Sequence, residues 1–256
     1  MKEKYRFKNG KIIIDMYRDK DYSPKNHIVT LYGLLSSPLG PYNNATNILI
    51  KNGFTVWCPH YEGTFASDGV CTFDNAVGSV IKTIQLIEKR KATSLFSNTE
   101  TTWNKDKIVV VGSSFGGSIA LVAAGKSRKI NKVVSLAGPT DYRMHKNIFS
   151  YYPRWKKGWQ NTWRTNRTFW QKFAKGNLDL NAINYAKLLL SKNVVLVHDK
   201  GDKQVDFRQS KILYEAIKNG PGQHKLVAFN NGIHFSTDDF GNKRILKEIM
   251  LLASSI

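Results

Sequence analysis

One serine of this chain is placed where the nucleophile of an acyl-transfer reaction would stand. Ser114 is the middle residue of Gly112-Ser113-Ser114-Phe115-Gly116, which follows a β-favouring run (108–111) and precedes a helix-compatible run (118–124). Strand, Gly-x-Ser-x-Gly and helix in this order are typical of a nucleophile elbow, a sharp turn that strains the backbone of the serine. Glycines flank the serine because side chains there would strike neighbouring elements. We predict Ser114 as a nucleophile; the alternative is an ordinary strand-to-helix turn.

A serine hydroxyl needs a base within hydrogen-bond reach, usually a histidine oriented by a carboxylate. Functional groups gather at the C-terminal ends of strands in an open parallel sheet. Asp202 follows a predicted strand at 193–198, and His234 follows another at 225–229. Both come after Ser114, in the order serine, acid, histidine that this elbow uses. We therefore predict Asp202 as the acid and His234 as the base, the alternative being surface loop residues.

Four other residues compete for the acid and base roles. Asp199 lies close to the end of its strand and could be a turn residue, and Asp206 is placed to cap the next helix. His198 lies at a strand tip before the predicted acid, whereas the expected order needs the base later. His224 begins a strand instead of following one.

Acyl transfer also needs hydrogen-bond donors for the oxyanion that develops on the substrate. The backbone N–H of Phe115, the residue after the nucleophile, is the first expected donor. The loop after the predicted strand 27–32 should supply the second, and we place it at the N–H of Leu34. Because backbone donors do not depend on side-chain type, the choice of Leu34 rests on geometry alone.

The elements that would position these groups alternate along the chain. A hairpin is predicted over 4–8 and 11–17, with Asn9-Gly10 as its turn. Strands follow at 27–32, 54–58, 107–111, 132–136, 193–198 and 225–229, and helices at 42–51, 74–91, 207–218 and 243–252. This alternation predicts an α/β fold with a mostly parallel sheet covered on both faces. We expect a single domain over 1–256, with one insertion at about 140–190 that lacks this alternation of strands and helices.

The insertion is rich in tryptophan and in positive charge. Trp155, Trp159, Trp163 and Trp170 fit one face of a helix that begins near Pro153. Such a stripe favours packing, but Trp155, Trp159 and Trp163, with Tyr32 beside the predicted oxyanion loop, are also our candidates for substrate binding. Residues 143–175 hold nine Lys or Arg and no Asp or Glu. Seven of them could favour an anionic substrate: Arg143, Lys146, Arg154, Lys156, Lys157, Arg164 and Arg167.

Composition sets further expectations. The net charge is +20, which can attract anions or simply keep the protein soluble, and we find no nucleic-acid-binding module in the sequence. We expect no membrane span, because no run of 18 apolar residues exists. Two cysteines and no visible export signal favour a cytoplasmic location. No residue spacing calls for a metal or an organic cofactor.

Together these segments resemble the α/β-hydrolase superfamily, in particular its branch of prolyl-oligopeptidase catalytic domains, dienelactone-hydrolase-like enzymes and small esterases. The resemblance rests on four parts of the chain: the elbow (112–117), the acid segment (196–205), the histidine segment (231–235), and the segments 59–63 and 67–69 after the second predicted parallel strand. Asp199 and Tyr32 depart from it, standing where glycine and histidine are usual. The resemblance implies an α/β-hydrolase fold and places the insertion where this superfamily carries substrate-covering caps.

We therefore expect a serine hydrolase that cleaves an ester or thioester of an apolar acyl group through an acyl-Ser114 intermediate. A peptidase or an acyltransferase with the same triad is the alternative within enzymes, because specificity lies in the pocket. The alternative that is not an enzyme is a non-catalytic protein that binds nucleic acid or an anionic membrane through its basic insertion. The expected partner is a small acyl substrate, which the basic insertion would favour if it is anionic.

Overall fold

A computed structural model describes residues 2–20, 26–104, 107–145, 151–176 and 178–255. An eight-stranded sheet runs through the molecule in the order β1-β2-β4-β3-β7-β8-β9-β10. Its strands are β1 (Lys2–Asn9), β2 (Ile12–Asp19), β3 (Asn26–Leu31), β4 (Phe54–Pro59), β7 (Lys107–Ser113), β8 (Lys132–Leu136), β9 (Asn193–Asp199) and β10 (His224–Phe229). Pairing is antiparallel from β1 to β4 and parallel from β4 to β10. The mostly parallel sheet expected from the sequence is therefore confirmed.

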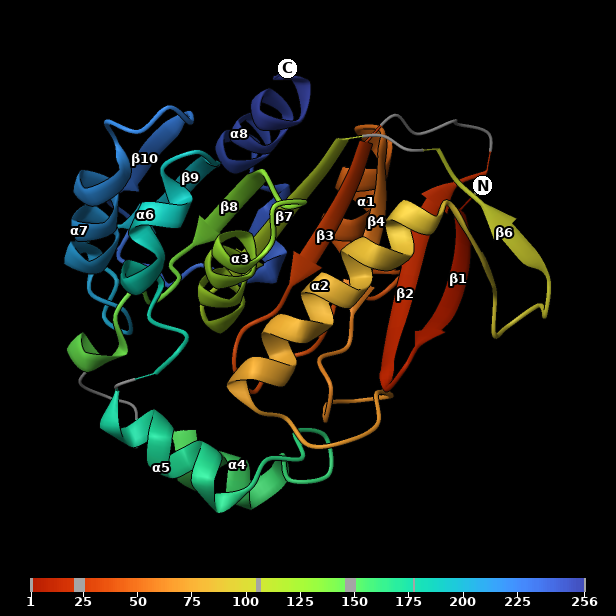
Figure 1. The fold of residues 1–256 in the computed structure, drawn as a ribbon, viewed down its shortest axis with the longest axis horizontal. Coiled ribbons are helices and arrows are strands. Elements are labelled where there is room, and N and C mark those ends of the chain that lie inside the picture. Colours follow the sequence, from red (N-terminus) through yellow and green to blue (C-terminus); the bar gives the residue numbers. More distant parts are fainter. Residues whose placement is uncertain (1, 21–25, 105–106, 146–150, 177, 256) are drawn as a thin grey trace.

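Helices cover both faces of this sheet (Figure 1). One face packs against α1 (Asn44–Lys51) and α8 (Lys243–Ser254), around strand residues such as Val109 and Val195. The other face packs against α2 (Phe73–Lys89), α3 (Phe115–Lys126) and α7 (Phe207–Ile217), around residues such as Val110 and Leu196. Alternate side chains of a strand point to opposite faces, so a strand buried on both faces is apolar throughout. This explains why the central strands have continuous apolar runs.

One local prediction differs from the structure, and one small element was not predicted. In the hairpin Asn9 pairs with Ile12, so the turn residues are Gly10 and Lys11, one position later than expected. Gly10 takes the positive φ of 63° that the turn requires. The short ribbon of β5 (Lys91–Thr93) and β6 (Glu100–Thr102) was not predicted, because three-residue strands leave no periodicity to detect.

The insertion does not form the single Trp-bearing helix that we predicted. It has two main helices, α4 (Tyr151–Gly158) and α5 (Arg167–Lys175), with η1 (Tyr142–Met144) before them and η3 (Ala182–Tyr185) and α6 (Ala186–Leu189) after them. The first helix ends at Gly158, a poor helix former, and Asn166 caps the start of the second by accepting the Phe169 N–H. Figure 1 shows α4 and α5 together, apart from the helices that cover the sheet.

Among the residues that the structure describes, no helix is both long and apolar enough to cross a bilayer.

Candidate active site

The turn after β7 has the backbone of a nucleophile elbow. Ser114 has φ 51° and ψ −123°, a conformation that non-glycine residues rarely adopt. A Cβ on Gly112 would lie 2.1 Å from the carbonyl oxygen of Gly116, and one on Gly116 would lie 2.5 Å from that of Leu31. Only glycine fits at either position, so the two glycines of the segment allow the sharp turn from strand to helix.

The loop after β3 lies against this serine. A Cβ on Gly33 would come within 3.3 Å of the Ser114 Cβ and 3.8 Å of its Oγ, so the backbone that leads to Leu34 borders the hydroxyl. Phe115 begins α3, where a helix leaves its first N–H groups unpaired. Within the described residues neither the Phe115 N–H nor the Leu34 N–H has an acceptor. Both remain our predicted oxyanion donors.

The predicted acid and base lie in contact. Asp202 Oδ2 lies 2.7 Å from His234 Nδ1, although 32 positions separate them. The Asp202 side chain is fully buried, and its Oδ1 accepts the N–H groups of Gln204 at 2.8 Å and Val205 at 3.0 Å. Burial alone would raise the pKa of Asp202, but bonds from His198, His234 and Val205 hold it well below its usual range. The carboxylate is thus kept ionised beside the imidazole.

These groups share one edge of the sheet because β7, β9 and β10 run parallel. Ser114 directly follows β7, Asp202 follows β9, and His234 follows β10. With Nδ1 bonded to Asp202, the Nε2 of His234 has no hydrogen-bond partner in the part of the chain that the structure describes. A side chain 12% exposed can meet both solvent and a substrate at this edge.

The four competing residues have other partners. His198 is fully buried, with Nε2 3.0 Å from the Val205 carbonyl and 3.2 Å from Asp202 Oδ2, and with Nδ1 2.7 Å from Ser210 Oγ. A carbonyl only accepts, so Nε2 carries the proton, and His198 lies against the candidate acid on the side away from His234. Asp206 caps α7 and pairs with Arg208, and His224 lies in β10 with Nε2 3.2 Å from the Leu189 carbonyl. Asp199 accepts three backbone N–H groups.

The insertion packs against and hydrogen-bonds to the core beside the elbow. Trp163 forms a β-bridge with Thr64, is fully buried, and donates its Nε1–H to the Ser36 carbonyl at 3.1 Å. Its ring lies 5.9 Å from that of Phe115. Trp163 therefore packs against the residue next to Ser114, in a position fixed by the loop after β4.

The other candidate substrate contacts are also packed. Tyr32 is fully buried, and its hydroxyl pairs with Thr64 Oγ1 at 2.6 Å and accepts the Tyr61 N–H at 3.0 Å. Trp155 and Trp159 are partly buried, and the Trp155 Nε1–H bonds to the Trp163 carbonyl at 2.7 Å. These positions favour the packing alternative for Tyr32 and Trp163, since neither side chain reaches the surface.

The cations of the insertion differ in their surroundings. Arg164 donates to the carbonyls of Phe65, Ser67, Gly69 and Asn161. Arg143 is paired with Asp141 at 2.7 Å. The remaining members of the predicted set are exposed, namely Arg154, Lys156, Lys157 and Arg167, while Lys146 lies outside the described residues. Arg143 is exposed as well, but the carboxylate of Asp141 already neutralises its charge.

Two residues of the insertion that were not predicted, His145 and Tyr151, lie toward the loops of Asp202 and His234. Burial lowers the pKa of His145, and the nearby His234 lowers it further while Asp202 opposes this. The ring of Tyr151 lies 6.3 Å from that of His145, and its hydroxyl lies 3.4 Å from Gln204 Oε1 in the loop of Asp202. Nothing in the local sequence marks these residues, because their nearness to His234 depends on how the insertion folds back.

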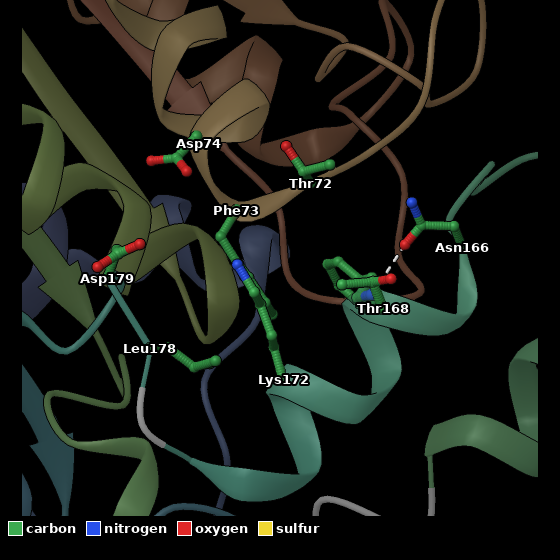
Figure 2. A pocket seen from close by; sticks show the side chains of 9 residues that line it. Thr72, Phe73, Asp74, Asn166, Thr168, Lys172, Leu178 and Asp179 are labelled. Atoms are coloured by element: carbon green, nitrogen blue, oxygen red, sulfur yellow. Dashed lines mark hydrogen bonds between the residues drawn. The ribbon is translucent and has the colours of Figure 1, made fainter.

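A pocket also opens where the insertion meets α2 (Figure 2). Residues at the start of α2 and along α5 line it, and Lys172 extends across it toward Phe73. The ring of Phe73 stacks on Phe169 at 4.5 Å and lies 6.3 Å from that of Phe115. Phe73 thus separates this pocket from the elbow, and none of its lining residues belongs to the loops of Ser114, Asp202 or His234.

A model of the prolyl oligopeptidase family matches residues 42–253, which include the elbow and the loops of the acid and the histidine. The chain belongs to the prolyl oligopeptidase family. Members of this family are serine hydrolases, and the expected branch of the α/β-hydrolase superfamily is confirmed. No curated protein matches the chain by sequence.

Solved structures share the fold of this prolyl oligopeptidase family member. An esterase of Pyrococcus furiosus is similar with a TM-score of 0.69 and 15% identity, over 98% of this chain and 91% of that one. An α/β hydrolase of a Penicillium species is similar with a TM-score of 0.69 and 12% identity, over the full length of both. An acylaminoacyl peptidase of Pyrococcus horikoshii has a TM-score of 0.66 and 14% identity, and this chain spans 42% of its length. The α/β-hydrolase fold is thereby confirmed.

Proposed function

We propose that this protein is an esterase that cleaves an ester or thioester of an apolar acyl group through a covalent acyl-Ser114 intermediate. The observation that carries the proposal is the 2.7 Å contact between Asp202 Oδ2 and His234 Nδ1, at the sheet edge where Ser114 sits in its elbow. A carboxylate bound to Nδ1 fixes the tautomer of the imidazole and stabilises its protonated form. The elbow, the acid and the base thus supply the three parts that acyl transfer requires.

The reaction follows from these positions. His234 Nε2 takes the proton from Ser114 Oγ as the oxygen bonds to the acyl carbon, and the carbonyl oxygen becomes an oxyanion. The N–H groups of Phe115 and Leu34 stabilise that charge. The imidazolium then gives its proton to the departing alkoxide or thiolate, which leaves acyl-Ser114. Water, deprotonated by His234, attacks the acyl carbon and releases the acid and the free serine.

The core behind the elbow is apolar, which is compatible with an apolar acyl group, although its buried rings do not themselves reach a substrate. Phe115 lies among aromatic rings, with Tyr61 6.2 Å and Trp163 5.9 Å away. On the side of the insertion, the ring of Tyr151 lies 6.3 Å from that of His145, and the Tyr151 hydroxyl lies 3.4 Å from Gln204 Oε1 in the loop of Asp202. The exposed cations of the insertion favour a leaving group or acyl chain that carries a carboxylate or phosphate.

A substrate panel tests this proposal. Turnover would be measured with p-nitrophenyl esters of two, four, eight and twelve carbons, and with thioesters whose leaving groups are neutral or carry a carboxylate. We expect hydrolysis that depends on acyl length and is abolished in Ser114→Ala. Faster cleavage of acyl-peptide anilides than of any ester would favour a peptidase, and product transfer to an added alcohol or amine would favour an acyltransferase.

The alternative outside enzymes has its own result. A protein that acts only by binding would hydrolyse none of these substrates. It would instead bind nucleic acid or anionic vesicles, with an affinity that falls as the salt concentration rises. We also propose a cytoplasmic location, supported by two free and buried cysteines, Cys58 and Cys71.

A further inference from the structure

A second carboxylate lies beneath the candidate acid and histidine. Asp199 is the last residue of β9 and is fully buried. Its Oδ1 accepts the N–H of Gly201 at 2.8 Å and that of Gly232 at 3.0 Å, and its Oδ2 accepts the N–H of Asn231 at 2.6 Å. One side chain therefore binds three backbone donors from two separate segments.

The two segments are those that carry the acid and the base. Gly201 precedes Asp202 in the acid loop (200–205), and Asn231 and Gly232 precede His234 in the histidine loop (230–235). The loops touch at this point, since a Cβ on Gly201 would lie 2.9 Å from the Cα of Gly232. Asp199 thus bonds to both loops where they meet, one residue before Asp202 and two and three residues before His234.

The chemistry of the site suits an ionised carboxylate. Burial raises the pKa of Asp199, but the N–H groups of Asn231, Gly201 and Gly232 outweigh this and hold the pKa below its usual value. A carboxylate only accepts, and N–H bonds to it are stronger than bonds to a neutral oxygen. An asparagine of the same shape has one acceptor oxygen and keeps at most two of the three bonds.

We propose that Asp199 is a positioning residue that holds the histidine loop on the acid loop and so sets the distance between His234 and Asp202. The inference rests on the proposed function, because it assigns those two residues the acid and base roles. Asp199 is fully buried, and its hydrogen bonds among the described residues go to the two loops and not to Ser114. Its effect is therefore on the rate of proton transfer and not on substrate affinity.

Asp199→Asn tests this role, with Asp206→Asn as the matched control. Asp206 is a carboxylate of the same segment that caps α7 and pairs with Arg208. In Asp199→Asn we expect kcat to fall about 10- to 100-fold with KM within about twofold, since a displacement of 1 Å at a catalytic group can cost about 10²-fold. The pH profile of kcat/KM should also move to lower pH, because losing the Asp199 charge and loosening the Asp202 contact both disfavour the imidazolium. Asp206→Asn should retain the wild-type kcat and pH profile.

Other results would overturn the inference. A folded Asp199→Asn with the wild-type kcat and pH profile would do so, as would an activity loss that matches only a lower melting temperature with the pH profile unchanged. If a fluorophosphonate does not label the wild type, that result would instead contradict the proposed function itself. If the variant does not fold, hydrogen exchange of the wild-type protein tests whether Asp199 binds the histidine loop. The amides of Asn231 and Gly232 lie in exposed residues, yet should exchange at least about tenfold more slowly than unprotected amides; exchange at the unprotected rate would contradict the proposal.

Discussion

Asp202 Oδ2 meets His234 Nδ1 at 2.7 Å and thereby fixes which nitrogen of the imidazole is left to act. The same carboxylate oxygen lies 3.2 Å from His198 Nε2, so a buried histidine holds it from the other side. Asp202 cannot turn away from His234 without losing both this contact and its bonds to the Gln204 and Val205 amides. The candidate acid is thus held in one orientation by the surrounding protein.

The first prediction concerns this acid. Asp202→Asn should fold normally but lose about 10⁴-fold in kcat, because an amide donor opposite Nδ1 selects the wrong tautomer of His234. Ester hydrolysis by the purified variant, together with its melting temperature, measures both effects. Turnover near that of the wild type would move the acid role to another carboxylate.

The second prediction concerns the loop beside the serine. In Gly33→Ala the new methyl group would lie 3.3 Å from the Ser114 Cβ, so the loop or the serine must shift. We expect kcat to fall by about tenfold or more, because oxyanion donors act only at close range. Gly40→Ala in the same loop is the control, since its Cβ would meet nothing within 4 Å. Equal activity in the two variants would show that Gly33 does not border the reacting hydroxyl.

The third prediction separates packing from substrate contact at Tyr32. Tyr32→Phe removes the hydroxyl that pairs with Thr64 and accepts the Tyr61 N–H. We expect the free energy of unfolding to fall by about 1–3 kcal/mol with KM within about twofold, because buried polar groups lose their partner. Tyr42→Phe, at a side chain that is 94% exposed, should change neither quantity. A large rise in KM without loss of stability would make Tyr32 a substrate contact.

The fourth prediction is a dependence of stability on pH. Burial would raise the pKa of Asp15, but Arg6, at 2.6 Å, and His60 hold it well below its usual value. A lowered native pKa gives stability that is complete above the unfolded value of about 3.9 and is lost as the pH falls below it.

Urea unfolding at a series of pH values between 6 and 2.5 measures this effect. The free energy of unfolding of the wild type should fall steadily below about pH 4. Asp15→Asn should be less stable at neutral pH and should show a shallower fall. A wild-type curve that is flat down to pH 2.5 would be inconsistent with the low pKa.

Local signals along the chain were enough to predict the sheet and the candidate acid and base. Apolar runs predict central strands because both faces are buried. Position relative to the ends of strands and helices, together with order along the chain, distinguishes Asp202 and His234 from their competitors. The elbow was also visible locally, since Gly112 and Gly116 are required by contacts within a few residues and with β3.

Long-range contacts decide what the sequence could not show. Trp163 belongs to a β-bridge with Thr64, 99 positions earlier, and not to a helical stripe. Asp199 was expected to be a turn residue, and it does accept the Gly201 N–H, but its bonds to Asn231 and Gly232 cross 32 and 33 positions. His145 was missed for the same reason, because the folded insertion alone brings it near His234.

Covalent labelling at Ser114 tests the central claim most directly. The purified protein would be treated with a fluorophosphonate, digested, and mapped by mass spectrometry, with Ser114→Ala and Ser113→Ala treated in parallel. We predict one modified peptide with the phosphonate on Ser114, its loss in Ser114→Ala, and its retention in Ser113→Ala. No labelling of the wild type under conditions where a known serine hydrolase reacts, or equal labelling of Ser114→Ala, would contradict the account.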